Sequence, residues 1–208
     1  MNKILALKIM LLLMLFLFTA AGCHLFGADS DADEVSKLNS KIEELTGGAF
    51  EVPMHDDYPL VYAHLSRPPD DVDNETFSIV LLYSEDRYPV KAYWSEARIN
   101  ELESHGISIL YGPYVKDPDE PLGEENYIMI EYSPVFKNVS VAIAAREYDT
   151  GTWDINGQKI GYAYQGKEII DAYLPMAEAG VIASYFLGDN FTEEAAKEFT
   201  AFLVNELY

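Results

Sequence analysis

Cysteine and basic residues are scarce in this sequence. Cys23 is the single cysteine among 208 residues, so the chain cannot form an internal disulfide. Lysine and arginine total 14 against 35 aspartates and glutamates, and the formal net charge is −21. Because nucleic acid is bound through clustered Lys and Arg, this charge argues against nucleic acid as a partner. It would also repel the chain from an anionic membrane surface.

Sequence motifs for catalysis and for zinc are missing as well. The chain has no Gly-x-Ser-x-Gly, no Ser-x-x-Lys and no His-Glu-x-x-His. His55, in Met54-His55-Asp56-Asp57, could share a metal site with His64, but the histidines lack ligand spacing and a polar turn is the favoured setting for His55. The sequence therefore predicts no catalytic residue, no cofactor and no metal site, and it favours a protein that is not an enzyme.

Three acidic runs invite a calcium interpretation that their spacing does not support. An EF-hand loop needs Gly at its sixth position and Glu at its twelfth, and neither the run from Asp29 nor the run from Asp117 has them. A looser oxygen cage stays open, although solvated acids are expected in a chain this negative. The runs are Asp29, Asp31 and Asp33; Asp70, Asp71 and Asp73; and Asp117, Asp119 and Glu120.

Long apolar runs are limited to the N-terminus. Lysines precede an apolar stretch from Ile9 to Phe18, and small residues follow it up to Cys23. The uncharged run from Ile9 to Ala21 is shorter than the ~20 residues of a transmembrane helix. This order is typical of a cleaved signal peptide and predicts removal of residues 1–22.

The residues Ala20-Ala21-Gly22-Cys23 resemble the lipobox of bacterial lipoproteins, with Ala20 where that motif usually has Leu. The resemblance implies cleavage between Gly22 and Cys23, a diacylglyceryl group on the Cys23 sulfur, and an acyl chain such as palmitate on the freed amine. It implies a lipid-anchored protein on the extracytoplasmic face of the cell membrane. Two acyl chains would hold the protein stably where one would be marginal.

Two other interpretations of this segment stay open. Ala20-x-Gly22 also suits an ordinary secretory signal peptidase, and the segment could be retained as a signal anchor. Cysteine usage argues against both, because an exported protein with one odd cysteine needs a reason for it and lipidation supplies one. Residues 23–34 are then the lipidated cysteine and an acidic, solvated tether, and about ten residues of tether reach at most ~35 Å at ~3.5 Å per residue.

Residues 35–208 are predicted to form a single α+β domain, an antiparallel sheet rich in meanders with helices near both ends. Apolar spacing predicts a helix over 33–45 ended by Gly47-Gly48, a helix capped by Ser95 that turns Ile99 and Leu102 inward, and a helix over 191–207. Thr192 or Asn190 is the expected cap of the last helix, whose apolar face comprises Ala195, Phe199, Phe202 and Leu203.

Alternating and β-branched runs predict the strands of this sheet. The runs 77–83 and 88–94 are expected to form a hairpin, and Asn156-Gly157 marks a second one. The run 139–146 is apolar on both faces, which predicts a central strand. The remaining expected strands are one or two within 50–66, around Val52 and over 60–65, and those over 107–111, 127–132, 160–164, 169–174 and 181–187. The longest expected loop is 115–126.

The C-terminal third carries a second, weaker resemblance. Asn156-Gly157-Gln158-Lys159, the strand over 181–187 and Phe191-Thr192-Glu193-Glu194-Ala195 are similar to the end of an uncharacterised domain on Gram-positive lipoproteins. Those domains look distantly like lipoprotein-carrier and sigma-regulator lipid-binding folds. The resemblance implies a curved antiparallel sheet closed by helices and no particular chemistry.

Tyrosine is abundant, with 15 residues, several of which lie on or beside the predicted strands. Tyr162 and Tyr164 share a strand face, where phenols could stack on sugars, peptides or lipid headgroups. The preference of Tyr for half-buried strands explains the pattern equally simply and is favoured. The others are Tyr83, Tyr93, Tyr111, Tyr114 and Tyr185.

These observations predict a membrane-anchored lipoprotein that binds a ligand or a membrane-proximal partner without performing chemistry. Two alternatives remain. A hydrolase acting on envelope polymers would need carboxylates that converge in a cleft. A carrier of lipid or lipoprotein would need an apolar cavity between sheet and helices.

Overall fold

The computed structural model describes residues 28–68, 76–85, 90–91, 94–115, 128–138, 149–189 and 191–208. The chain divides into two units, residues 1–41 and residues 42–208, and helix α2 (Ala28–Thr46) spans the boundary between them.

Helix α2 begins at Ala28, earlier than the predicted Asp33. Residues 28–34, which the sequence assigns to an extended tether, are therefore helical. Acidic residues are favourable at this end because the helix dipole is positive there. A helical residue advances the chain by only ~1.5 Å, so the tether is shorter than an extended chain would be. The helix ends as predicted, with Gly47 and Gly48 at φ values of 63° and 79° and the Gly48 amide donating to the Glu43 carbonyl.

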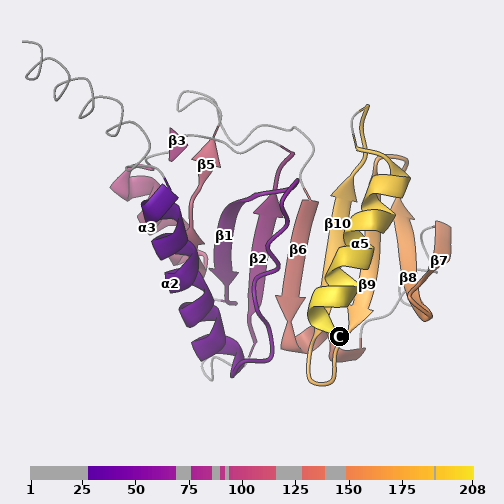
Figure 1. The fold of residues 1–208 in the computed structure, drawn as a ribbon. Helices are drawn as coiled ribbons and strands as arrows, with labels where there is room; N and C mark the ends of the chain where they lie inside the picture. Colours follow the sequence, from indigo (N-terminus) through magenta and orange to yellow (C-terminus); the bar gives the residue numbers. More distant parts are fainter. Residues whose placement is uncertain are drawn as a thin grey trace, which may run out of the picture. The chain divides into compact units, whose positions relative to one another are not determined.

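An eight-stranded antiparallel sheet forms the framework of the second unit (Figure 1), in the order β4-β1-β2-β6-β10-β9-β8-β7. With the helices, it confirms the predicted α+β class and antiparallel sheet. The short strands β3 (Val90–Lys91) and β5 (Tyr114–Val115) pair separately. The strands of the large sheet are β1 (Leu60–Ser66), β2 (Ser78–Tyr83), β4 (Ile107–Tyr111), β6 (Ile128–Ser133), β7 (Asp149–Ile155), β8 (Gln158–Gln165), β9 (Ile169–Pro175) and β10 (Gly180–Phe186).

The C-terminal half of the sheet follows the predicted meander, from β7 through β8 and β9 to β10. Asn156 and Gly157 form the predicted tight turn between β7 and β8, with φ values of 53° and 81°. A turn with positive φ at both central residues matches the twist of the two strands it joins.

The predicted hairpin between 77–83 and 88–94 is wrong. Strand β2 pairs with β1 on one side and β6 on the other, and β3 pairs with β5. The two runs are close in sequence, but the two edges of β2 are filled by β1, the strand before it, and by β6, from much further along the chain. The 3-10 helix η1 (Pro134–Asn138) then follows β6, where the sequence indicates a break at Ser133-Pro134.

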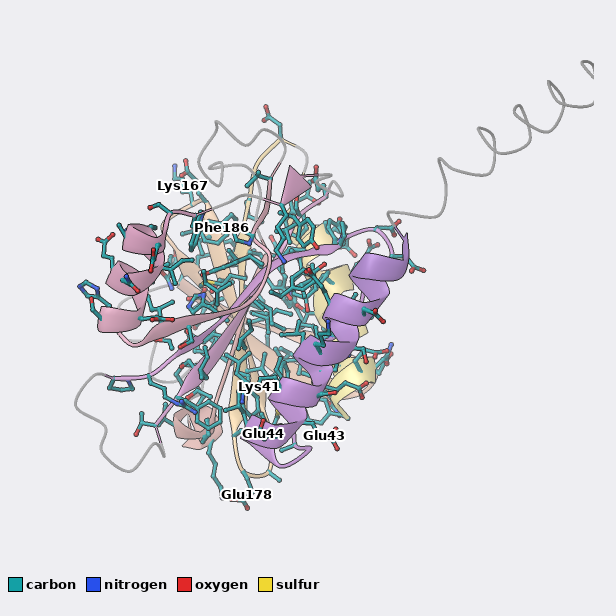
Figure 2. All side chains as sticks on the ribbon, turned by 90° about the vertical axis from the view of Figure 1, so that its left-hand side faces the viewer. Lys41, Glu43, Glu44, Lys167, Glu178 and Phe186 are labelled. Atoms are coloured by element: carbon teal, nitrogen blue, oxygen red, sulfur yellow. The ribbon has the colours of Figure 1, made fainter. Side chains whose placement is uncertain are left out.

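Helix α5 (Glu193–Leu207) and helix α3 (Glu96–Ser104) lie on opposite sides of the sheet (Figure 2). The strand register aligns one residue from each neighbouring strand in a row across the sheet, on the face toward α5. The members of this row that lie on the central strands are buried. Ala183 of β10 pairs with Ala172 of β9, and these small side chains let α5 approach the sheet. The row runs Ala63, Leu81, Ile130, Ala183, Ala172, Tyr162 and Gly151.

Large aromatic side chains fill the space between the sheet and α5. Tyr83, Tyr185, Phe191 and Phe199 are all fully buried there. Thr192, one of the two predicted caps, caps α5, and its hydroxyl accepts from the Ala195 amide at 3.3 Å. The buried face of α5 differs from the predicted one, because it comprises Ala196, Phe199, Thr200, Leu203 and Val204, whereas Ala195 and Phe202 are half-buried.

Helix α3 has the predicted Ser95 cap, which accepts from the Arg98 amide at 3.3 Å. Its apolar residues do not turn inward as predicted. Ile99 is 36% exposed and Leu102 is half-buried, and none of the α3 side chains is fully buried. The helix is short and weakly amphipathic, so it contacts mainly the neighbouring edge strand β4.

Two other predictions lie outside the described residues: the central strand over 139–146 and most of the loop over 115–126. In the part of the chain that the structure describes, no helix is both long and apolar enough to cross a membrane.

Candidate functional site

The candidate site is formed by the irregular segment from Phe50 to Pro59, which runs along the sheet before β1 begins. The Phe50 ring stacks on Tyr132 of β6 at a centroid distance of 4.6 Å. The Tyr83 hydroxyl donates to the Pro53 carbonyl at 2.8 Å, and the Ser84 amide donates to the Pro59 carbonyl at 3.2 Å. Prolines lack the amide that a strand would use, so the segment is held by these contacts and not by a sheet ladder.

A cavity of about 510 Å³ opens beside this segment, where β2 ends and β1 begins. Its volume is within the range of small-molecule pockets. Met54 is 48% exposed on its wall, an unusual exposure for a large apolar side chain. The cavity is lined by Met54, His55, Asp56, Asp57, Pro59 and Glu85.

Aromatic rings hold His55 at this cavity. The imidazole stacks on Phe199 at 5.1 Å and meets the edge of Phe202 at 4.6 Å, and Tyr58 lies 5.1 Å away. The Asp57 amide donates to His55 Nδ1 at 3.1 Å, so this nitrogen is an acceptor and a neutral ring carries its proton on Nε2. Because Phe199 is fully buried, the His55 side of the cavity packs against the core of the domain and is not supported by a loop alone.

The electrostatic environment of the cavity is negative. Burial raises the pKa of Tyr58, and the carboxylates of Glu85, Asp57 and Glu198 raise it further. These three acids come from the end of β2, the segment before β1 and helix α5. Among the described residues, none of the three has a basic side chain in ion-pair contact. A pocket lined by several carboxylates attracts positively charged groups.

The chain matches no known protein family, curated protein or solved structure at a significant level. The site must therefore be interpreted from its own geometry and charge.

The residues that the sequence singles out for lipid attachment and cleavage, Cys23 and Gly22, lie outside the described residues. Both stay predictions. The same holds for the acidic runs at Asp70 and at Asp117, while Asp33 is an exposed residue of helix α2. Within the described ranges, no three His, Cys, Asp or Glu side chains converge in a way that could hold a metal ion.

His55 and His64 do not come together. His55 packs against α5, whereas His64 on β1 pairs with Val80 and lies beside Tyr62 on the opposite face of the sheet. Burial lowers the pKa of His64 below its ordinary value. Its Nδ1 has no hydrogen-bond partner among the described residues, which is consistent with a neutral ring in an apolar setting.

Tyr162 and Tyr164 share a face of β8, as predicted, but both are engaged within the domain. Tyr162 stacks on Trp153 at 4.4 Å, and the Tyr164 hydroxyl donates to Glu193 of α5 at 2.6 Å. This hydrogen bond, with burial and the Glu193 charge, raises the pKa of Tyr164 to about 12. These contacts favour the structural interpretation of the two tyrosines over stacking on a ligand.

The sequence interpretation missed a buried polar group on the α3 face of the sheet. Asp171 of β9 is 4% exposed and accepts from the Ser184 hydroxyl at 2.7 Å and from the Gln165 amide. A charged residue inside the apolar run 169–174 is the signal that could have revealed it. Both carboxylate oxygens have donors, so the group meets the requirement of a buried carboxylate and links three strands.

Proposed function

We propose that this chain is a lipoprotein anchored through Cys23 on the extracytoplasmic face of the cell membrane, and that its domain binds a ligand or partner at the cavity beside His55. The anchor is supported by the order of charge, apolar run and small residues before Cys23. A helical start to the domain limits its reach further, so a membrane-proximal partner is favoured.

The observation that carries the binding role is the cavity itself. It combines an exposed methionine with charged groups, and it is backed by rings that belong to the buried core. A pocket with a rigid base keeps its shape before a ligand arrives, which reduces the entropy lost on binding.

The two alternatives have less support. The space between the sheet and α5 is filled by Tyr83, Tyr185, Phe191 and Phe199, so a lipid cavity has no room in that part of the molecule. A hydrolase would have to use Asp56, Asp57 and Glu85, which line the same cavity, as its acid and base.

Native mass spectrometry of the chain, purified from its own membrane in a non-ionic detergent, tests the binding role. The variant Met54→Trp fills the cavity mouth without touching the core, and Val135→Trp is a matched control, since Val135 is 53% exposed on η1. We expect a retained ligand mass in the wild type and the control that disappears in Met54→Trp. Equal retention in all three proteins would contradict binding at this cavity.

A further inference from the structure

We infer that the cavity beside His55 selects a primary ammonium group at the end of a short alkyl stem, the group carried by a lysine side chain or a small diamine. This inference rests on the proposed binding role of the cavity and specifies its ligand.

The negative charge of the cavity walls predicts that the ligand is positively charged. Asp57 and Glu85 line the cavity, and Glu198 lies close enough to act on the Tyr58 hydroxyl. An anion would meet the like charges of the lining acids Asp56, Asp57 and Glu85, and a neutral ligand would leave these acids unused. A cationic group in the cavity would be attracted by the lining carboxylates and, at longer range, by Glu198 of α5.

The spacing of the acids favours an ammonium group over a metal ion. A divalent ion needs ligand oxygens at roughly 2.0–2.6 Å, and no three acidic or histidine side chains among the described residues converge to that extent. An alkylammonium is satisfied at longer range, with hydrogen bonds to one or two oxygens and attraction to the others.

The rings and Met54 fit the remainder of such a ligand. Tyr58 and Phe202 pack against the His55 ring, with centroid distances of 5.1 and 4.6 Å, and so hold this lining ring in place beside an alkyl stem. The exposed Met54 side chain is flexible and apolar, which suits contact with an alkyl stem. The cavity of about 510 Å³ admits a four- or five-carbon stem without rearrangement.

The test is a titration of the full chain in non-ionic detergent micelles, followed by NMR of labelled methionine methyl groups and by calorimetry. The probes are N-acetyl-lysine methylamide, its norleucine analogue, which keeps the stem but lacks the charge, and 1,5-diaminopentane. We expect the lysine derivative to shift the Met54 signal and bind at least about tenfold more tightly than the norleucine derivative. Stronger binding of the diamine than of the lysine derivative would identify a free amine as the natural source, and the reverse would identify a protein side chain.

Variants then connect the binding to the named acids. Asp57→Asn and Glu85→Gln should each weaken lysine binding by about threefold to tenfold, because each keeps the shape and removes one charge. Glu103→Gln removes an exposed charge on α3, across the sheet, and should leave the affinity within about 1.5-fold.

Two results would overturn the inference, and they separate it from the proposed function. If the norleucine derivative binds as tightly as the lysine derivative and shifts the Met54 signal, the cavity binds ligands but not through charge. If no probe shifts that signal at millimolar concentration, the ammonium assignment is wrong, and the native mass measurement alone decides whether the cavity binds anything.

Discussion

The hydrogen bond between Tyr185 and Thr200 gives a quantitative test of how the sheet is fixed to α5. The two hydroxyl oxygens are 2.6 Å apart and both side chains are fully buried. Thr200 also donates to the Ala196 carbonyl at 2.8 Å, so its oxygen is the acceptor toward the Tyr185 hydroxyl. Burial raises the pKa of Tyr185 well above its ordinary value, so the phenol stays protonated at neutral pH and donates.

The expected energies follow from which group loses its partner. Tyr185→Phe removes the donor and leaves Thr200 bonded to Ala196, which should lower the free energy of unfolding by about 1 kcal/mol. Thr200→Val keeps the shape but leaves a buried phenol without an acceptor, so we expect a loss of about 2 kcal/mol. The double variant has no unpaired hydroxyl and should lose about 2 kcal/mol, which gives a coupling energy of about 1 kcal/mol.

Urea unfolding of a soluble chain that begins at His24, followed by tryptophan fluorescence, measures these quantities. Tyr208→Phe is the matched control, because the Tyr208 hydroxyl donates to the Pro175 carbonyl but the residue is 55% exposed. We expect that variant to change stability by less than about 0.5 kcal/mol. Losses at Tyr185 and Thr200 that simply add would show that the two hydroxyls do not interact and would refute the assigned packing of α5.

Three further predictions concern other parts of the chain. Cys23→Ala should leave an uncut precursor or protein released to the medium, as shown by fractionation and intact mass, and a normally trimmed protein in the membrane would contradict lipidation. Glu193→Gln should lower the pKa of Tyr164 from about 12 toward the ordinary value near 10, because the phenolate no longer faces a carboxylate; an unchanged value in a spectrophotometric titration would contradict the hydrogen bond. Gly157→Ala should destabilise the domain by about 1 kcal/mol in the same urea assay, since the turn holds this residue at φ 81°, and no loss would contradict the tight turn.

The alkaline limit of stability is also set by tyrosine. Burial is the main cause that raises the pKa of Tyr62 to about 12, with Arg98 opposing it. Because the folded-state pKa is raised, protonated Tyr62 stabilises the folded protein fully below pH ~10. This contribution, roughly 2 to 3 kcal/mol in total, is lost as the pH rises from ~10 to ~12. Tyr62→Phe should therefore flatten the fall in stability over that range, and an unchanged slope would contradict a buried Tyr62.

Features that depend on a few adjacent residues could be predicted from the sequence. The Asn156-Gly157 turn, the Ser95 and Thr192 caps and the Gly47-Gly48 helix end each need only local backbone geometry, and all were confirmed. The antiparallel meander from β7 to β10 was predictable for the same reason, because short turns join consecutive strands.

Features that depend on residues far away in the sequence could not be predicted. Strand β2 pairs with β6, which lies far along the chain, and not with the run that follows it directly. The local hairpin pattern after Tyr83 was therefore misleading. The inward face of α5 was misassigned at Phe202 because a ring at the helix border contacts His55, and nothing in the helix sequence shows that neighbour. The cavity itself joins the end of β2 and the segment before β1, and only the folded chain brings their acids together.

Site-specific photo-crosslinking in the native envelope tests the central claim most directly. A small aliphatic photoreactive residue that carries a diazirine, close to methionine in size, is introduced into the full chain at Met54 or at Val135, two apolar side chains with matched exposures of 48% and 53%. After irradiation, intact mass spectrometry detects a covalent adduct of any size, whether a small ligand or a protein. Binding at the cavity predicts a light-dependent adduct at position 54 and none at position 135. Adducts at both positions in equal yield, or at position 135 alone, would contradict it.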